Sequence, residues 1–401
     1  MAPVAVHRMI IGGATLDVGG MRVPRERTAY GRPVMTVTPA CHGSTAGTQP
    51  ISDANRLGLD YAAEANCFAY DGPIIDIHTH ISSPRSAELF LDAADAYGIK
   101  RCWTMTGLRT VEPILTSLPT EREGRIQFIC VPDFSQREEE GTFTTKWLED
   151  IEAFYALGSR IIKYWAGPRG LDFAPGPDSP MRLDSPIRKQ GMQLAYDTGY
   201  RVFMTHVGDP DTWFKTAYAD ASKYGTKLDQ YKPLEELLDQ YHDVTWIGAH
   251  MGGWPEDLDW LHDFLSRHPN YVVDTSATKW QVRELSKQPV RFRQFVEANP
   301  GRVLFGSDIV AWPTNTDPDP EHPDAGHGLD LYASRYWTLR TLLETGYTGP
   351  SPIVDPDLHK VDPSVDPKST AGLSGTALPE ALLQDVYYNA AEAVLRRGGV
   401  I

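Results

Sequence analysis

The sequence predicts an α/β protein, a (β/α)8 barrel of the TIM type with an N-terminal short-stranded extension and long C-terminal loops. From Ile74 onward, short β-branched or apolar runs alternate with amphipathic stretches, the pattern of repeated strand–helix–strand units. Polar residues suited to metal binding follow several of these runs, as they do at the carboxyl ends of barrel strands. The alternative is an open, doubly wound sheet, because a single sequence leaves strand boundaries open.

Length and composition fit one such domain with extensions. The chain has 401 residues, of which 41% are hydrophobic and 23% charged, ordinary values for a globular protein. Residues 1–72 are rich in Gly, Pro and turn signals and predict the short-stranded extension, so we expect the barrel domain at residues 73–401.

Charge and hydropathy exclude several partners. The chain has 38 basic and 53 acidic residues, a formal charge of −15, which argues against nucleic acid or an anionic membrane. The 4 cysteines form no CxxC pair and indicate a reducing compartment. No apolar run has the length of a membrane span, and the N-terminus lacks the apolar core of a signal peptide. We expect a cytoplasmic enzyme with a small-molecule substrate, and homo-oligomerisation stays open.

The predicted elements alternate along the barrel domain. The strands are expected at Ile74–Ile77, Arg101–Thr106, Ile126–Val131, Ile161–Tyr164, Val202–Thr205, Val244–Ala249, Tyr271–Asp274 and Val303–Gly306. The helices between them are expected at Ser86–Tyr97, Lys146–Leu157, Pro186–Thr198, Leu234–Gln240 and Asp257–Ser266. Residues 313–328 and 347–378 are rich in Pro, Asp and Gly and predict long loops. A closing amphipathic helix, Pro379–Arg396, is expected on the barrel exterior.

The segment Ile-Asp-Ile-His-Thr-His ends at His80, at the close of the first strong strand. Side chains at positions i and i+2 of a strand share a face, so His78 and His80 can point together at one ion. Neutral imidazole is a good ligand for zinc and iron. Taken alone, this pattern is weak evidence for a metal.

Four further residues end later predicted strands: Lys163, His206, His250 and Asp308. In a parallel barrel these ends meet on the catalytic face. Each residue also has a structural alternative: an ion pair for the lysine, a hydrogen-bonded strand end for either histidine, and a loop cap for the aspartate. The coincidence at five strand ends favours a bound metal.

At this point the chain resembles the amidohydrolase superfamily, especially its amidohydrolase-related branch, which includes decarboxylases of the aminocarboxymuconate-semialdehyde type. The resemblance runs from about Pro73 to Leu395. It is carried by PIIDIHTH, FMTHVGDP, GAHMGGWPEDL, VLFGSD and LPEALLQDVYYNAAEAVL. These motifs together identify the superfamily and say nothing about the substrate.

The resemblance implies ligand roles. His78, His80 and Asp308 would hold one metal, with Asp308 also moving protons, and His206 would be a ligand in both the one-metal and two-metal branches. His250 would be a free acid/base with one metal and a ligand with two. Lys163 favours two divalent ions, because dinuclear members bridge them with a carbamylated lysine at the end of the fourth strand; the departure is that Tyr164 and Trp165 follow it here.

Aromatic and basic residues on the loops suggest a substrate class. Clustered aromatic residues at a barrel mouth suit a bulky apolar ligand, and basic residues there hold a carboxylate or phosphate. The predicted substrate-binding residues are Trp165, Trp213, Trp254, Trp280 and Arg283. Further candidates are Trp312, Arg109, Arg169, Lys279 and Arg335. Packing between loops and exposure on the surface remain their alternatives.

Three kinds of enzyme fit these residues. The first is a hydrolase of amide, ester or lactone bonds with zinc. The second is a nonoxidative decarboxylase. The third is a diiron oxygenase acting on a terpenoid-like or aromatic acid derivative. A barrel that only binds a ligand is a weaker alternative, because no expected metal-site residue is missing. The residues alone do not choose the metal, since imidazole and carboxylate suit zinc, iron and manganese.

Overall fold

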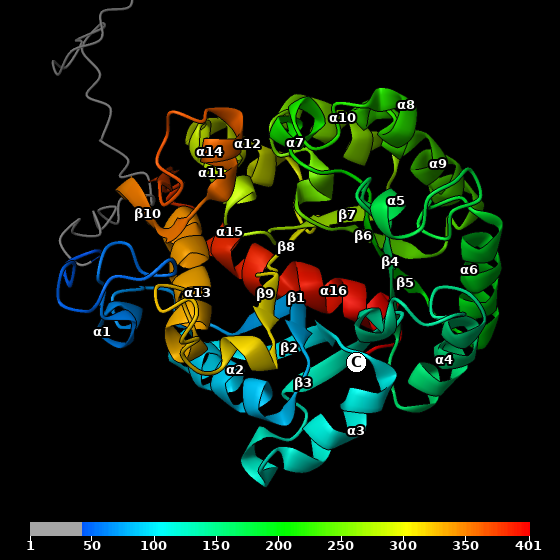
Figure 1. The fold of residues 1–401 in the computed structure, drawn as a ribbon, viewed down its shortest axis with the longest axis horizontal. Coiled ribbons are helices and arrows are strands. Elements are labelled where there is room, and N and C mark those ends of the chain that lie inside the picture. Colours follow the sequence, from blue (N-terminus) through cyan, green and yellow to red (C-terminus); the bar gives the residue numbers. More distant parts are fainter. Residues whose placement is uncertain (1–41) are drawn as a thin grey trace, which may run out of the picture. The chain divides into compact units, whose positions relative to one another are not determined.

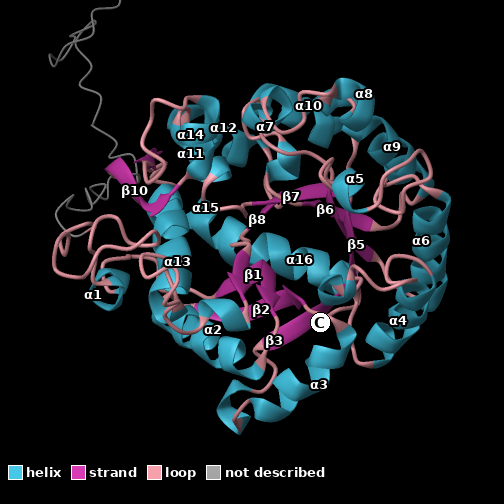
Figure 2. Cartoon of the chain, in the orientation of Figure 1, coloured by secondary structure: helices cyan, strands magenta, loops and turns pink. Residues whose placement is uncertain are grey.

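The computed structural model describes residues 42–401, in which one parallel sheet of 9 strands is surrounded by helices (Figures 1 and 2). Neighbouring strands follow the order β8-β7-β6-β5-β4-β3-β2-β1-β9. Their bounds are β1 Ile74–Ile81, β2 Ile99–Met105, β3 Ile126–Cys130, β4 Ile161–Trp165, β5 Val202–His206, β6 Thr245–Gly248, β7 Tyr271–Asp274, β8 Val303–Leu304 and β9 Ile309–Ala311. This arrangement confirms the predicted α/β barrel class and all eight predicted strands.

The eighth strand of the barrel is interrupted. β8 pairs with β7 and β9 pairs with β1, so the ladder of paired strands does not close without a break. Two backbone hydrogen bonds cross the break: Ile77 N–H donates to Phe305 O at 3.0 Å, and Asp308 N–H donates to His78 O at 2.8 Å. Strand β9 was not predicted, because three apolar residues behind a polar Ser-Asp pair resemble a loop.

Residues that favour helix termini mark the ends of several helices. The Ser83 and Ser86 side chains form a capping box at the start of α2, and α6 ends at Gly199 with a φ of 118°. The longer helices are α2 Pro84–Ala96, α3 Leu108–Ser117, α4 Thr145–Ala156, α6 Pro186–Thr198, α9 Lys227–Gln240, α10 Leu258–Arg267, α12 Pro289–Ala298, α13 Gly328–Glu344 and α16 Ala390–Arg397. The shorter ones are α1 Tyr61–Ala65, α5 Gly170–Phe173, α7 Asp211–Lys215, α8 Ala221–Tyr224, α11 Trp280–Ser286, α14 Pro356–Val361 and α15 Glu380–Gln384.

Helix α16 does not lie on the barrel exterior as predicted. Its buried residues Ala390, Ala391, Val394 and Leu395 belong to the same apolar cluster as inward-facing strand residues such as Ile75. Figure 1 shows α16 crossing the middle of the ring of strands. The amphipathic pattern predicts the helix, but it does not say which end or face of a barrel the apolar side covers.

Two connecting regions also differ from the prediction. The described part of the extension, residues 42–72, contains α1 and an isolated bridge between Ser52 and Asn55 but no strand; residues 1–41 lie outside the described part of the chain. Residues 347–378 form an antiparallel hairpin, β10 Thr348–Val354 and β11 Thr370–Ser374, that flanks α14. The Pro, Asp and Gly residues that predicted a loop lie mostly in and around its turns. Within residues 42–401, no helix is long and apolar enough to cross a membrane.

Candidate metal centre

Strand β1 and the break in the eighth strand bring three predicted ligands together. His78 and His80 share one face of β1, and their Nε2 atoms lie 3.4 and 3.2 Å from Asp308 Oδ1. These three side chains form one of the two His/Asp groups in the described chain whose donor atoms are close enough to share an ion. His78 is 1% exposed and Asp308 28% exposed, so the group is buried on one side and open on the other.

His206 and His250 form a second pair next to this group. His206 ends β5 and His250 follows β6, and His250 Nε2 lies 3.1 Å from His206 Nδ1. The two loops approach closely because Gly253 has a φ of +82° and no side chain; a Cβ there would lie 2.5 Å from Gly208 O. Glycine at this position therefore lets the two imidazoles meet.

Lys163 lies beside the first group, in contact with His78. It lies on β4, its side chain is buried, and its Nζ lies 3.2 Å from His78 Nε2. The His78 and His250 rings are 5.1 Å apart between centroids. Burial lowers the pKa of Lys163 to about 8. All six predicted ligands thus lie in one contiguous cluster at the carboxyl ends of the strands.

The cluster fits a divalent metal by spacing and by charge state. Two ligands that each lie about 2.1 Å from one ion are separated by about 3 Å, which is the separation between the donor atoms of each pair. Burial and the Lys163 ammonium lower the pKa of His78, and burial and His206 lower that of His250, so both rings favour the neutral form that binds metals. Burial alone raises the pKa of Asp308, but the hydrogen bond with His80 and the nearby imidazoles hold it well below its usual value.

Two residues that the sequence analysis missed hold these ligands in place. Asp274 at the end of β7 lies 2.8 Å from His78 Nδ1 through Oδ2 and accepts a hydrogen bond from His250 N–H through Oδ1. Ser276 Oγ lies 2.7 Å from His250 Nδ1. A carboxylate on the far ring nitrogen fixes the tautomer and orientation of a metal-binding histidine. Asp274 itself ends a predicted strand, so the rule that found the other ligands could have found it.

Backbone strain is concentrated at the same strand ends. His250, Ala277 and Asp308 have φ values of 60°, 75° and 55°, in the left-handed region that L-residues rarely adopt. Each such residue costs about 1–3 kcal/mol and persists only where its surroundings impose it. The loops after β6, β7 and β8 therefore hold strained backbone, and two of the strained residues, His250 and Asp308, are candidate metal ligands.

A pocket of about 300 Å³ opens beside Asp308. It is lined by the loop after β7, by β9 and by α13. Of the predicted substrate contacts, Trp280, Lys279 and Arg335 line it, and the Trp280 ring lies 5.8 Å from that of His250.

The other predicted substrate contacts lie elsewhere. Trp165 lies near the candidate metal ligands, its ring 6.2 Å from that of His206. Trp254 packs on Trp260 at 4.3 Å, and Trp213 Nε1 donates to Asp357 at 2.7 Å. Arg283 is buried and pairs with Glu284 and Asp355. Trp312 and Arg109 are exposed. The structure thus gives Trp213, Trp254 and Arg283 packing or ion-pair partners of their own, and their role in substrate binding stays a prediction.

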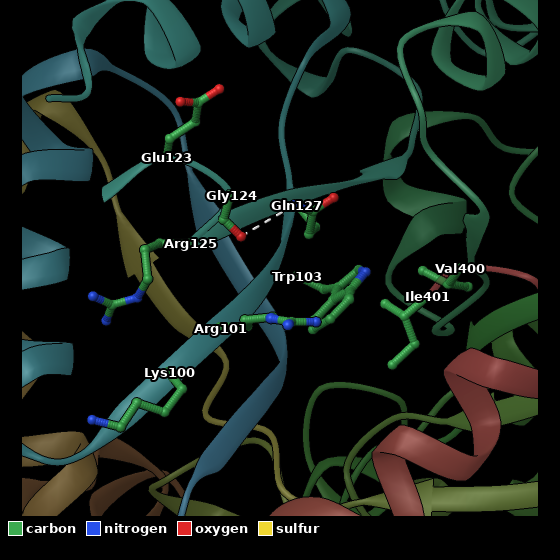
Figure 3. A pocket seen from close by; sticks show the side chains of 9 residues that line it. All are labelled: Lys100, Arg101, Trp103, Glu123, Gly124, Arg125, Gln127, Val400 and Ile401. Atoms are coloured by element: carbon green, nitrogen blue, oxygen red, sulfur yellow. Dashed lines mark hydrogen bonds between the residues drawn. The ribbon is translucent and has the colours of Figure 1, made fainter. Parts of the chain in front are cut away.

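A second pocket, of about 360 Å³, lies at the opposite ends of the strands (Figure 3). Lys100, Arg101 and Arg125, at or just before the starts of β2 and β3, line it together with Trp103 and Val400. In Figure 3, Lys100 and Arg125 extend away from the side to which Arg101 points. No predicted ligand lines this pocket.

Comparison with known proteins places the chain in a family. The amidohydrolase-2 family, described as "Amidohydrolase", matches residues 75–397. No curated protein matches the chain.

Several solved structures match the chain at low similarity. They include 5-carboxyvanillate decarboxylase LigW from Sphingomonas paucimobilis, with 12% identity, a TM-score of 0.39 and coverage of 81% of this chain and 99% of the other. An amidohydrolase II has 13% identity and a TM-score of 0.39, covering 80% and 99%. A protein of Agrobacterium tumefaciens in its apo form has 15% identity and a TM-score of 0.43, covering 82% and 95%. These values are too low for the activities of those proteins to bear on this chain. The family match covers most of the sequence and includes all six predicted ligands, so the chain belongs to the amidohydrolase-2 family.

Proposed function

We propose that this protein is a metal-dependent hydrolase that uses two divalent cations to cleave an amide, ester or lactone bond of a bulky apolar substrate. The observation that carries the proposal is Lys163, whose amine lies 3.2 Å from His78 Nε2 in a buried position. Within residues 42–401, no carboxylate forms an ion pair with it. Addition of its amine nitrogen to CO2, with loss of a proton, would give a carbamate, a bridging ligand between the two pairs of imidazoles.

The side chains divide the work as follows. His78, His80 and Asp308 would hold one cation, His206 and His250 the other, and Lys163 would bridge them. Such cations polarise a carbonyl and lower the pKa of water. Asp308, partly open to the pocket, accepts the proton of the attacking water and returns it to the leaving group. Asp274 keeps the His78 ring oriented.

A nonoxidative decarboxylase is the second candidate. It is favoured by one observation: His78, His80 and Asp308 form a complete ligand group, whereas His206 belongs to neither such group in the described chain. With a single cation, His250 would be free for general acid/base duty and would deliver a proton to the carbon that loses CO2.

Elemental analysis of protein purified without added metal distinguishes these candidates. We expect about two divalent ions per chain, one fewer in Lys163→Ala, and hydrolysis of ring-containing esters, lactones or amides. The matched control is Lys146→Ala, which removes an exposed lysine that pairs with Glu139 and should keep both ions. One ion per chain after saturation would favour the decarboxylase. Iron with an optical band that changes under oxygen would favour a diiron oxygenase and overturn the hydrolase.

A further inference from the structure

We infer that Lys279 and Arg335 form a carboxylate-binding subsite beside the metal centre, which selects a substrate carrying a carboxylate away from the bond that reacts. The inference deepens the proposed function, since the bound molecule is its substrate. Lys279 immediately precedes α11, Arg335 lies on α13, and both line the pocket of about 300 Å³ that also contains Asp308. A ligand in this pocket is therefore adjacent both to the Lys279 and Arg335 side chains and to the candidate metal ligands.

Lys279 and Arg335 have no ion-pair partner in the described part of the chain, and the acid that acts on Arg335 at longer range is Asp308, in the same pocket. The acids near Lys279 are Asp355, Asp357 and Asp53. Each of these acids has its own cation. Asp355 pairs with Arg283, Asp357 Oδ1 lies 3.3 Å from Lys360 Nζ, and Asp53 Oδ2 lies 2.6 Å from Lys368 Nζ.

The two unpaired cations also act on each other. Burial and the charge of Arg335 lower the pKa of Lys279 to about 8. Like charges held close together in a partly buried pocket repel, and an anion between them would relieve that repulsion. This arrangement favours an anionic ligand over a neutral one.

The Arg335 guanidinium is anchored on one side only. Its Nη1 donates to Leu331 O at 2.9 Å and to Ser334 Oγ at 2.8 Å. Its Nε and Nη2 have no hydrogen-bond partner in the described part of the chain. A fixed guanidinium with free donors is suited to a planar carboxylate, and Lys279 adds a second charge.

The rest of the pocket suits a ring. Trp280, Tyr332 and Leu331 contribute aromatic and apolar wall, Ile309 and Val310 extend it, and Thr278 and Asn315 add polar groups. A cavity of about 150 Å³ holds one benzene ring, so the volume of about 300 Å³ accommodates a ring, its carboxylate and the linkage to the reacting group. The ligand class is thus an apolar, ring-containing carboxylate.

The test compares benzoate with benzamide, which share a ring and a shape but differ in charge. Calorimetric titration of the metal-loaded protein should show at least tenfold tighter binding of benzoate. Lys279→Gln and Arg335→Gln should each remove most of this preference while keeping the metal content. Lys279→Arg, which retains the positive charge, should keep the preference. The matched controls Lys232→Gln and Arg85→Gln, with side chains 71% and 59% exposed, should keep it.

The His78→Ala variant separates this inference from the proposed function. It should bind less metal yet still prefer benzoate, because the subsite does not include His78. If the preference disappears in His78→Ala but survives in Lys279→Gln and Arg335→Gln, the metal centre holds the carboxylate and the inference is wrong. Equal affinity for benzoate and benzamide in the wild type, or tighter binding of phenyl phosphate than of benzoate, would also overturn it. Failure of the hydrolase proposal would appear in the metal count and in hydrolysis, not in this preference.

Discussion

The two ends of the barrel contain pockets of similar size and similar composition. The one at the carboxyl ends has about 300 Å³ and the one at the amino ends about 360 Å³, and each has basic residues and a tryptophan. At the amino ends, Arg125 pairs with Asp95 at 2.6 Å, whereas Lys100 and Arg101 form no ion pair within the described residues, and the basic side chains extend in different directions (Figure 3). At the carboxyl ends, Lys279 and Arg335 have no acidic partner within the described residues and lie beside Asp308.

The difference shows that composition alone does not make a site. At the carboxyl ends, the loops after β6, β7 and β8 hold non-glycine residues in the left-handed region and bring polar side chains into a buried cluster. At the amino ends, α16 closes the barrel with apolar residues. We therefore expect substitutions at the first end to change function and substitutions at the second end to leave it unchanged.

The largest expected effect is loss of a metal ligand. His78→Ala and Asp308→Ala should abolish hydrolysis and reduce the metal content, because each removes a donor from the buried group. Circular dichroism should show an intact fold, since the apolar core of the barrel is untouched, and thermal unfolding should show only the stability that is lost with the metal. Near-normal turnover in either variant would mean that the metal centre has been misidentified.

A smaller loss is expected from Asp274→Asn. The amide keeps the shape of the side chain but not its charge, so it supports the His78 ring less well. Supporting groups of this kind change metal affinity or activity by about 10–100-fold. A metal-binding titration followed by kinetics at saturating metal checks this, with the conservative Asp274→Glu as a comparison. Unchanged metal affinity in Asp274→Asn would reduce Asp274 to a packing role.

Tryptophan substitutions sharpen the contrast between pocket wall and packing. Trp280→Ala should weaken an apolar ligand by about 1–3 kcal/mol, the value of the lost aromatic wall. Trp254→Ala should instead lower the thermal stability and leave affinity unchanged, because Trp254 packs on Trp260 and Tyr231. Calorimetry and thermal unfolding of both variants measure the two effects. The reverse pattern would mean that the ligand binds next to Trp254 and not next to Trp280.

The pH dependence of stability tests the charge state of the pocket. The pKa of Lys279 is lowered from 10.5 to about 8, chiefly by burial, so below about pH 8 the folded protein carries a charged amine that burial disfavours. Between pH 8 and 10.5 the folded state releases this proton before the unfolded state does, and the penalty disappears. Wild type should therefore gain stability relative to Lys279→Met across this window. Urea unfolding at several pH values measures the difference; a constant difference would mean that Lys279 is solvated.

The smallest effect is expected at the amino ends of the strands. Arg101→Gln removes a cation from that pocket and should change kcat/KM by less than about twofold, because the active sites of such barrels lie at the opposite ends of the strands. A larger change would show that the two pockets are functionally coupled, and the functional difference inferred between the two ends of the barrel would be wrong.

Sequence patterns predicted the barrel and the proximity of the six candidate ligands because both depend on local regularities. Apolar runs gave the eight strands to within a few residues. His78, Lys163 and Asp308 stood at or near the carboxyl ends of the predicted strands, where barrel geometry makes distant residues meet. The position of α16 and the hairpin β10–β11 could not be found in this way, because both depend on which surfaces the finished barrel leaves uncovered.

The substrate contacts were harder to predict for the same reason. Trp254 and Trp280 both follow strands, yet one packs on a neighbouring helix and the other lines the pocket. Arg283 and Arg335 differ likewise. Arg283 forms an ion pair with Asp355, which lies 72 residues later in the chain, whereas Arg335 forms no ion pair within the described residues. Whether a basic side chain has an ion-pair partner depends on the tertiary structure and cannot be predicted from its neighbours in the sequence.

The break between β8 and β9 has a thermodynamic consequence. Asp308 is both a predicted ligand and the residue whose N–H bonds to His78 O across the seam of the barrel. A cation shared by His78 and Asp308 would join the two edges of that seam, so its binding free energy would count toward keeping the barrel closed. Chelation should then speed amide hydrogen exchange at Ile77 and Asp308 more than in the continuous ladder between β4 and β5. In such a protein, metal affinity and the local opening of the eighth strand are one linked equilibrium.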